Sequence, residues 1–386
     1  MPGTVAVAGA LARKPGRGGH AWVLLQYLLG FRRLGWDVLF VDRLDEESSL
    51  DAAGRPCPPE RSTGARWFTD VMRSFGLLDG AALQDGDGRT VVGLPRSALA
   101  ARLGEAAAVV NVMGYLRDPE LLGAPGCRVF LDIDPGFPHM WNALGLANPF
   151  AGHDEFVTVG RNMGGPGCGV PDLGLNWIAI PPPVVLERWP VRERPPVDRV
   201  TSVATWRGAY GPVEYRGVRY GQRVHEFRPF GSIPRRSRLR FELALDADPA
   251  DGADVDALRR GGWTVVDPLR VAGTPEDYRE YLAGSSAELM VAKQMYVRSG
   301  GGWFSDRSAS FLASGRPVVA QDTGLAPWYP TDKGLLAFST PEGALDALGA
   351  VFADYESHAL AARRLAEETF DSDLVLGGLL SSLGLA

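Results

Sequence analysis

Short runs rich in valine and alanine alternate with helical patterns along most of this chain, and that alternation restricts the fold more than any other feature. Residues 4–11 form the first apolar run, and a glycine-containing loop follows it. Residues 21–36 then carry apolar side chains at helical spacing, and residues 37–42 have the composition of a buried strand. The order of strand, helix and strand predicts an α/β fold with a parallel sheet.

A second series of strand-like runs begins after the middle of the chain. Residues 181–196 are rich in proline and charge, which indicates a semi-rigid linker. Beyond them, strand-like runs alternate with helical patterns as they do in the first half. A chain of 386 residues is long enough for two hydrophobic cores. We therefore expect two α/β domains with parallel sheets, one of residues 1–190 and one of residues 191–358.

The stretch at residues 299–324 combines a glycine-rich loop, a short helix and a buried strand. Ser305 is a good N-cap, Gly315 stands where a C-cap belongs, and the strand begins at Pro317. A helix start leaves backbone N–H groups unpaired and carries roughly half a positive charge, so glycines in front of it allow a phosphate to approach. The stretch therefore predicts a phosphate-binding turn, and the alternative is a flexible connection.

Charged residues around this turn bear on the prediction in different ways. Arg298 and Arg307 add positive charge, and Lys293, which follows a buried strand, would point its ammonium into the same cleft. The alternative for Lys293 is an exposed lysine at a strand end. The negative charge of Asp306 would repel a phosphate. We therefore expect Asp306 to accept hydrogen bonds from hydroxyl groups of a ribose or sugar, or to cap the helix. Asp322 ends the next strand and is a second candidate for binding sugar hydroxyls, the alternative being a solvated acid.

His20 is the most promising titratable residue. It stands near the start of the first predicted helix, beyond the carboxyl end of the first strand, where ligands bind in folds of this kind. The helix dipole would hold its imidazole neutral, so His20 is a candidate general base near pH 7. Asp132 or Asp134, at the end of a later strand, would orient it. The alternative is a packing or capping residue.

The composition argues against several classes of protein. The net charge of −6 disfavours a general nucleic-acid binder, which needs a basic face. The three cysteines are widely separated, which indicates neither a disulfide framework nor a zinc site and fits a reducing cytoplasm. The N-terminus lacks the order of a signal peptide, and no apolar run approaches the roughly 18 residues of a membrane span. We expect a soluble, cytoplasmic protein without integral membrane association.

Sequence motifs for several kinds of chemistry are absent. The five histidines form no HxH or HExxH pattern, so we expect no metal site. The chain also lacks GxSxG, a Walker A sequence and GxGxxG, which argues against an α/β-hydrolase and against a nicotinamide or flavin cofactor. Residues 206–228 are rich in arginine and tyrosine, and we expect them to line the cleft around one nucleotide rather than to bind RNA.

Two runs of the sequence resemble those of bacterial GT-B glycosyltransferases. They are GGHAWVLLQYLLGFRRLGWDVLFVD at residues 18–42 and GWFSDRSASFLASGRPVVAQDTG at residues 302–324. The resemblance spans essentially the whole chain. It implies two Rossmann-like domains that face each other across a cleft, with C-terminal helices at residues 359–386 returning toward the first domain. The HxGxxT motif and the paired glutamates of many members are absent, so the stereochemical outcome stays open.

The resemblance also implies a function and a set of site residues. A nucleoside-diphosphate sugar would bind mainly on the second domain and a small-molecule acceptor, for example a natural product, mainly on the first, usually without a metal or a further cofactor. Gly18 and Gly19 would lie on the acceptor side, and His20 or Asp134 would deprotonate the acceptor hydroxyl. A nucleotide-sugar epimerase and a non-catalytic nucleotide-sugar binding protein are the alternatives, and a homodimer is a further prediction. The residues expected on the donor side are Lys293, Gly302, Ser305, Asp306, Arg307, Ser308, Asp322, Thr323 and Gly324.

Overall fold

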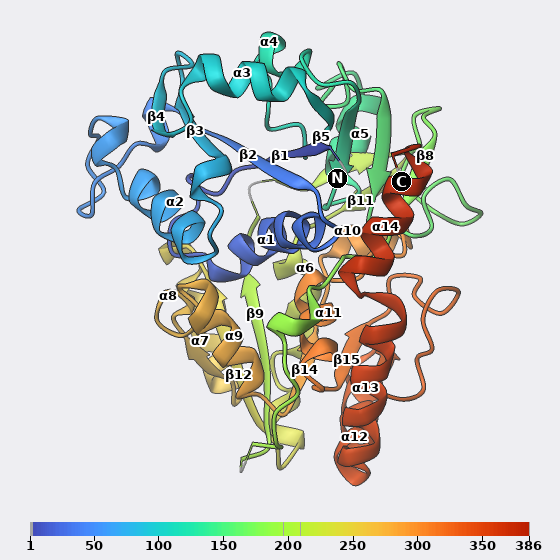
Figure 1. The fold of residues 1–386 in the computed structure, drawn as a ribbon. Helices are drawn as coiled ribbons and strands as arrows, with labels where there is room; N and C mark the ends of the chain where they lie inside the picture. Colours follow the sequence, from blue (N-terminus) through green and yellow to red (C-terminus); the bar gives the residue numbers. More distant parts are fainter. Residues whose placement is uncertain (1–2, 196, 209, 386) are drawn as a thin grey trace.

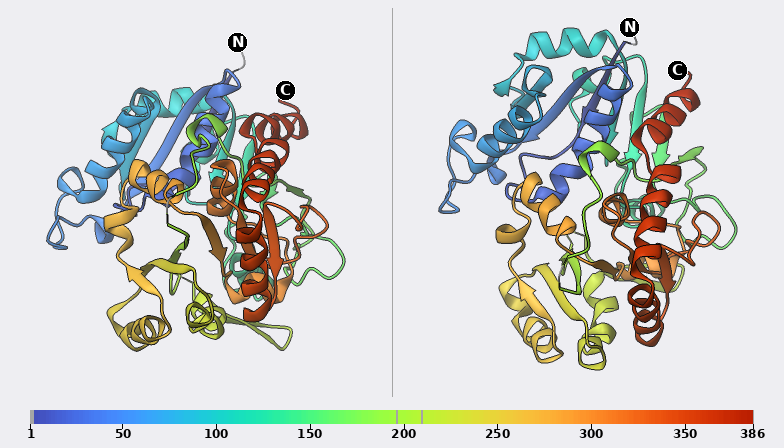
Figure 2. Two further views of the ribbon diagram at one scale, coloured as in Figure 1. Left: turned by 90° about the horizontal axis from the view of Figure 1, so that it is seen from below. Right: turned by 60° about the horizontal axis from the view of Figure 1, so that its bottom comes forward.

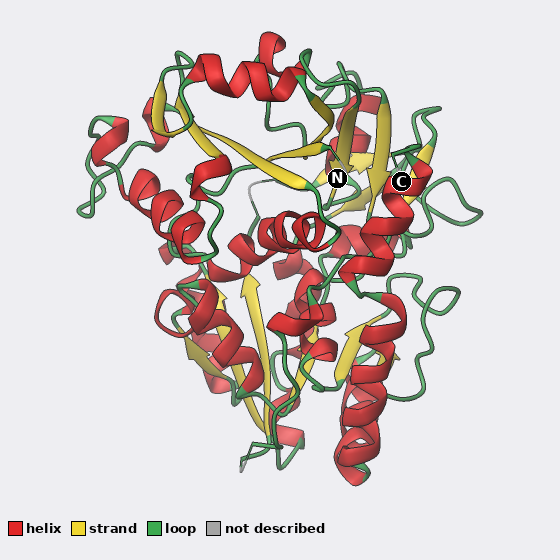
Figure 3. Ribbon diagram, viewed as in Figure 1, coloured by secondary structure: helices red, strands yellow, loops and turns green. Residues whose placement is uncertain are grey.

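Two β-sheets, one almost entirely parallel and one fully parallel, carry helices on their faces and form two α/β domains, the first above the second in Figure 1. The computed structural model describes residues 3–195, 197–208 and 210–385, so Pro196, the last residue of the predicted linker, lies outside the described part. Figure 3 shows the strands of both sheets covered by helices and loops. The predicted α/β class with two Rossmann-like domains is confirmed.

The first domain contains an eight-stranded sheet in the order β4-β3-β2-β1-β5-β6-β7-β8. Its neighbouring strands are parallel except β3 and β4, which pair antiparallel at one edge. The central strands are buried almost throughout, as expected where helices cover both faces. The strands are β1 (Thr4–Ala8), β2 (Asp37–Leu44), β3 (Ala81–Asp85), β4 (Thr90–Gly93), β5 (Ala106–Val112), β6 (Arg128–Asp132), β7 (Glu155–Thr158) and β8 (Trp177–Ala179).

The second domain contains a six-stranded parallel sheet in the order β13-β12-β9-β14-β15-β16. Numbered along the domain, this order is that of dinucleotide-binding folds, with the direction of the crossover connections reversing between β9 and β14. A small antiparallel hairpin, β10 with β11, lies outside the sheet. The strands are β9 (Arg199–Thr205), β10 (Val213–Tyr215), β11 (Val218–Tyr220), β12 (Arg240–Asp246), β13 (Thr264–Val266), β14 (Ala287–Met290), β15 (Val318–Gln321) and β16 (Leu335–Phe338).

Helices connect the strands and cover the sheets. Those of the first domain are α1 (Gly18–Arg33), α2 (Thr63–Ser74), α3 (Arg96–Gly104), α4 (Pro119–Leu122) and α5 (Phe137–Ala143). Those that follow are α6 (Arg223–Phe227), α7 (Gly252–Arg260), α8 (Pro268–Val271), α9 (Pro275–Ala283), α10 (Gln294–Ser299), α11 (Asp306–Ala313), α12 (Pro341–Ala353), α13 (Tyr355–Thr369) and α14 (Ser372–Ser382).

The start of α1 packs directly against the second domain. A Cβ atom on Gly18 would lie 2.1 Å from the Thr274 carbonyl oxygen, and the Gly18 N–H donates to the Ala272 carbonyl at 3.1 Å. The Trp22 indole, one turn later, donates to the Pro275 carbonyl at 2.8 Å. Glycine at position 18 therefore permits a backbone contact between the domains that no larger residue would allow.

The last helix returns to the first domain (Figure 2) and packs on α1. Leu376 is fully buried there, and the Arg33 guanidinium bonds the Asp373 carboxylate at 3.0 Å. At the start of α14, the Ser372 N–H donates to the Val184 carbonyl at 2.9 Å. The chain end thus joins the two domains a second time.

The first part of the segment expected to be a linker is part of the core. Val184, Val185 and Trp189 are all fully buried, and the Trp189 ring lies 4.9 Å from that of Trp22. Residues 190–194 of the same segment are exposed.

Candidate active-site cleft

A cleft of about 660 Å³ lies between the two domains. Its first-domain wall comes from the β1–α1 loop and from the ends of β5 and β6, and its second-domain wall from the end of β9 and the starts of α6, α10 and α11. Doubly wound sheets bind ligands at such strand ends, and the volume is typical of a small-molecule site. The cleft is therefore the candidate active site.

The structure divides the residues predicted for the site into two groups. Those that line the cleft are Gly18, Gly19, His20, Asp134, Lys293, Ser305, Asp306 and Arg307. Within the described residues, the lining does not include Gly302, Ser308, Asp322, Thr323 or Gly324. The roles assigned to both groups stay predictions.

The β1–α1 loop is held in place by the buried carboxylate of Asp42. Its Oδ2 accepts the N–H groups of Leu11 and Ala12 at 2.8 and 2.6 Å. Burial raises the pKa of Asp42 to about 7 against the opposing effect of these hydrogen bonds. Asp42 thus fixes the loop that brings Lys14 and Gly18 to the cleft.

His20 is oriented by a backbone carbonyl. Its Nε2 lies 2.8 Å from the Ala10 carbonyl oxygen, so Nε2 carries the proton and Nδ1 the lone pair. Its position deep in the cleft, reinforced by the charge of Lys14, lowers the pKa of His20 to about 3, which keeps the imidazole neutral at pH 7. The expectation that Asp132 or Asp134 orients His20 is wrong, because both carboxylates bond other residues.

Asp134 joins the two domains across the cleft. Its Oδ2 accepts from the Lys293 ammonium at 2.6 Å, and its Oδ1 accepts from the Tyr296 hydroxyl. Asp134 follows β6 of the first domain, whereas Lys293 and Tyr296 belong to the start of α10. Burial and the Asp134 charge raise the pKa of Tyr296 well above its usual value, so its hydroxyl keeps the proton that it donates.

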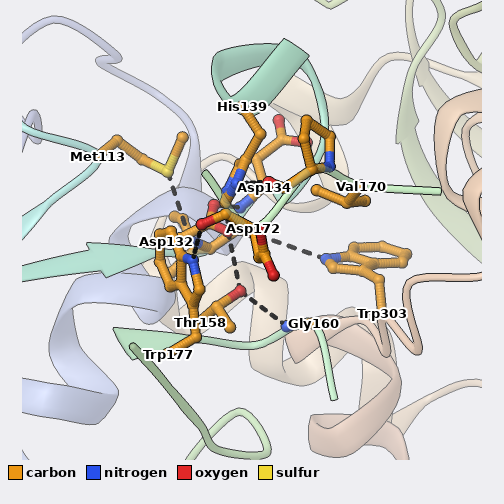
Figure 4. Close-up of polar contacts among 12 residues, drawn as sticks. Met113, Asp132, Asp134, His139, Thr158, Gly160, Val170, Asp172, Trp177 and Trp303 are labelled. Atoms are coloured by element: carbon orange, nitrogen blue, oxygen red, sulfur yellow. Dashed lines mark hydrogen bonds and ion pairs between the residues drawn. The ribbon is translucent and has the colours of Figure 1, made fainter. Parts of the chain in front are cut away.

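A fully buried network supports the end of β6 behind Asp134 (Figure 4). Asp132 Oδ2 accepts from His139 Nε2 at 2.9 Å and from the Thr158 hydroxyl at 2.8 Å. The other ring nitrogen of His139, Nδ1, lies 3.1 Å from the Pro171 carbonyl oxygen. Because Asp132, His139 and Thr158 have no exposed surface, they position the strand end and do not face a ligand.

Two buried arginines form part of the second-domain wall. Arg307 pairs with the Glu288 carboxylate, and its Nη1 donates to the Val203 carbonyl at 2.7 Å. Arg223 is 7% exposed, and burial lowers its pKa to about 10, so it remains charged at pH 7. Among the described residues, neither Arg223 Nε nor Arg307 Nη2 has a hydrogen-bond partner. These unused donors make the wall suited to an anion.

The start of α11 faces the cleft, because Ser305, Asp306 and Arg307 all line it. The predicted helix is therefore present, with its positive end toward the cleft. Burial raises the pKa of Asp306 above its usual value. A carboxyl group at this position thus carries its charge less readily than an exposed one would.

The glycine-rich loop contacts the first domain. Asn162 Nδ2 donates to the carbonyls of Gly300 and Gly324 at 2.8 and 3.0 Å, and its Oδ1 accepts from the Trp328 indole at 2.6 Å. Gly302 has a φ of +68°, and a Cβ atom there would lie 2.9 Å from Asn162. We call this contact the Asn162 clasp. These glycines therefore allow the loop to dock against the first domain.

The end of β15 braces the same loop. Asp322 Oδ1 accepts the N–H groups of Gly324 and Leu325 at 2.8 and 3.1 Å. The Thr323 hydroxyl donates to the Trp303 carbonyl at 2.6 Å. Asp322 and Thr323 thus shape the turn that carries the Asn162 clasp.

Several cleft residues were not among the predicted site residues. Arg17 pairs with Asp246 of the second domain at 2.9 Å, and Lys14 lines the cleft beside it. Both lie in the glycine-containing loop before His20, where their charge is visible in the sequence but does not by itself identify a site. Tyr210, Gln222 and Arg223 also line the cleft, which agrees with the expectation for residues 206–228.

Neither a metal cluster nor a membrane helix is found within the described part of the chain. No group of three or more histidine, cysteine, aspartate or glutamate side chains there is placed to hold a metal ion. The helices of that part are too short or too polar to cross a bilayer.

Comparison with known proteins gives matches at the level of structure. No protein-family model matches the sequence, and no curated protein matches it either. The structure of Anabaena Alr3699/HepE in complex with UDP-glucose is similar over 100% of both chains, with 12% identity and a TM-score of 0.59. An alpha-glucosyltransferase in complex with UDP and a 13-mer DNA is similar over 99% of both chains, with 11% identity and a TM-score of 0.57. Sucrose-phosphate synthase from Thermosynechococcus elongatus is similar over 99% of both chains, with 11% identity and a TM-score of 0.54.

These similarities cover the full length of the chain and identify its architecture as GT-B, with two Rossmann-like domains facing across a cleft. The identities of 11–12% are too low to transfer a substrate from any of these proteins.

Proposed function

We propose that the protein is a glycosyltransferase that moves a sugar from a nucleoside-diphosphate sugar to a hydroxyl group of a small-molecule acceptor, for example a natural product. The observation that carries the proposal is the buried Arg223 at the cleft, whose Nε–H lacks a partner within the described residues. A guanidinium with an unused donor fits the oxygens of a phosphate. The fold is shared with proteins solved in complex with UDP or UDP-glucose, which favours a nucleotide sugar as the ligand.

The donor diphosphate would lie between Arg223, Lys293 and the start of α11. Arg307 adds a further donor from the same wall, and the helix dipole favours negative charge at this end of α11. Asp306, beside them, would accept hydrogen bonds from hydroxyl groups of the sugar or ribose. We assign an indirect role to the residues outside the cleft lining. Gly302, Asp322, Thr323 and Gly324 belong to or brace the loop that leads into α11. Ser308 is buried within α11 behind the residues that line the cleft.

The proposed reaction needs a base for the acceptor hydroxyl. The base takes the hydroxyl proton, the acceptor oxygen bonds to the anomeric carbon, and the bond from that carbon to the diphosphate breaks. His20 fits this role better than Asp134, because its Nδ1 carries a lone pair whereas Asp134 is bound to Lys293 and Tyr296. A pKa of about 3 makes His20 a weak base in the empty cleft, and the negative charge of a bound diphosphate would raise that pKa. Gly18 and Gly19 would border the acceptor.

Negative charge on the departing nucleoside diphosphate would be stabilised by Arg223, Lys293 and the start of α11. We propose that these groups act in place of a metal ion and that the reaction needs no cofactor. We also place the enzyme in the cytoplasm, as the cysteine content suggests.

Release of UDP from UDP-glucose in the presence of an acceptor panel tests the proposal. We expect acceptor-dependent release that falls about tenfold or more in Arg223→Gln, because a hydrogen bond to a charged group contributes about 1.5–3 kcal/mol. Arg228→Gln is the matched control, since Arg228 lies outside the cleft lining and pairs with Asp254 at 3.0 Å. Isomerisation of the donor sugar without an acceptor would indicate an epimerase, and nucleotide binding without turnover a binding protein; either result contradicts the proposal.

A further inference from the structure

A second, smaller chamber opens beside the cleft in the first domain. It has a volume of about 120 Å³ and lies at the carboxyl ends of β1, β2, β3 and β5. Ala10, Arg13 and Tyr115 line both the chamber and the cleft, so the two spaces share a wall. A molecule that occupies the cleft on its first-domain side is therefore next to the chamber.

Gln84 is the most unusual residue of the chamber wall. It is only 4% exposed, and its Nε2 has no hydrogen-bond partner among the residues that the structure describes. Its Oε1 accepts from the Arg96 guanidinium at 3.5 Å, which leaves both amide hydrogens of Nε2 unused. An unpartnered amide in a buried position costs free energy, and an acceptor atom of a ligand would remove that cost.

The remaining walls offer both donors and acceptors. Arg117 is exposed at the chamber and supplies N–H groups. Asp87 supplies a carboxylate whose Oδ2 is paired with Arg89 at 2.9 Å. The Tyr115 side chain adds an aromatic ring at the shared wall. Asp42 also lines the chamber, but its oxygens are already bound to the backbone of the β1–α1 loop.

Most charges of the chamber wall are already paired. Arg13 and Arg43 line the chamber, and both are paired with Asp45. The carboxylates of Asp87 and Asp118 on the same wall are paired with arginines at 2.9 and 2.8 Å. A neutral group that both donates and accepts hydrogen bonds therefore fits better than a carboxylate or a phosphate.

We propose that this chamber binds a sugar unit of the acceptor, so that the acceptor is a saccharide or glycoside. Sugar hydroxyls both donate and accept, which matches the Gln84 amide, the Arg117 guanidinium and the Asp87 carboxylate, and the Tyr115 ring would contact the apolar face of the sugar. The rest of the acceptor would extend past Ala10, whose carbonyl orients His20. This inference rests on the proposed function, because it assigns the acceptor of the same cleft.

Saturation-transfer NMR on the full-length protein, with and without UDP, tests the inference. The probes are glucose, galactose, mannose, rhamnose and N-acetylglucosamine, with acetate and inorganic phosphate as competitors. We expect at least one sugar to bind, with a signal reduced about fivefold or more in Gln84→Met and Arg117→Ala, as loss of about 1 kcal/mol or more predicts. Arg73→Ala is the control, because Arg73 is an exposed arginine of α2 outside the chamber.

Each outcome of this experiment bears on the inference. No sugar binding, or binding that is equal in Gln84→Met and wild type, would overturn it, as would displacement of the sugar by acetate or phosphate. Methionine is similar in volume to glutamine, and the thermal midpoint of Gln84→Met shows whether this variant folds. Arg117→Ala changes an exposed residue and tests the inference independently of Gln84. Sugar binding that depends on Gln84, without binding of UDP, GDP, TDP, CDP or ADP, would contradict the proposed function, whereas the assignment of a sugar to the chamber would stand.

Discussion

At the scale of the residue, the cleft controls which protons are present on its side chains. His20 has a pKa of about 3 in the folded protein, against an ordinary value near 6.5. Its Nε2–H is fixed by the Ala10 carbonyl, so the tautomer follows from a backbone contact. Lys293 and Asp134, by contrast, neutralise each other across the cleft.

The His20 pKa predicts an acid-dependent loss of stability. Between pH 6.5 and about 3 the unfolded chain holds more protons at His20 than the folded protein does, so the free energy of unfolding falls as the pH falls. The contribution of this one group is at most about 1.4 kcal/mol per pH unit. Urea unfolding at several pH values should show a shallower acid dependence for His20→Gln, and an unchanged slope would contradict the burial effect.

The proposed base role of His20 gives a separate prediction. His20→Gln should lower turnover about 100-fold or more, because general base catalysis contributes typically 10² to 10⁴. The donor KM should stay close to the wild-type value, since His20 is assigned to the acceptor side. Steady-state rates of UDP release measure both constants, and full turnover in His20→Gln would pass the base role to another residue.

At the scale of the element, the start of α1 and the glycine-rich loop depend on contacts between the domains. Gly18→Ala should destabilise the protein by about 1–3 kcal/mol, because its Cβ would collide with the Thr274 carbonyl. Gly349→Ala in α12 is the matched control, since nothing lies within 4 Å of a Cβ there and the change should stabilise the helix by up to about 1 kcal/mol. Thermal unfolding of both variants measures the two changes in stability. Equal changes in Gly18→Ala and Gly349→Ala would contradict the close packing at Gly18.

The Asn162 clasp gives a second prediction at this scale. Asn162→Ala removes bonds to Gly300, Gly324 and Trp328, so it should lower stability by about 1–3 kcal/mol. Hydrogen exchange should also become faster in residues 299–303, which dock through this contact. The exposed Asn176→Ala is the control, and unchanged exchange in Asn162→Ala would show that the clasp does not hold the loop.

The elements were predicted from the sequence to different degrees. The positions of β2 and α1 were predicted from the sequence. Burial imposes a valine-rich run on such a strand and a helical spacing of apolar residues on such a helix. β3 was missed, since its sequence AALQD lacks β-branched residues although all its positions are buried. α10 was missed because six residues are too few to show helical periodicity.

At the scale of the whole molecule, the cleft exists because two doubly wound domains face each other at their ligand-binding edges. The resemblance of the sequence to GT-B glycosyltransferases predicted this arrangement of the domains. The arrangement places His20 and Lys293 in one cleft. The sequence did not indicate that Asn162 contacts residues 138 and 162 positions away, because such contacts depend on how the domains dock. Charge in a loop, as at Lys14, and in a mixed stretch, as at Arg223, was visible but not assignable without the fold.

The central claim is that a nucleoside diphosphate binds in the cleft through Arg223. Thermal unfolding with UDP, GDP, TDP, CDP and ADP tests it most directly, because a ligand that binds only the folded state raises the unfolding temperature. We predict that at least one of the five raises the midpoint by several degrees in wild type and in Arg228→Gln, and by much less in Arg223→Gln. No shift with any nucleotide, or an equal shift in Arg223→Gln, would contradict the account.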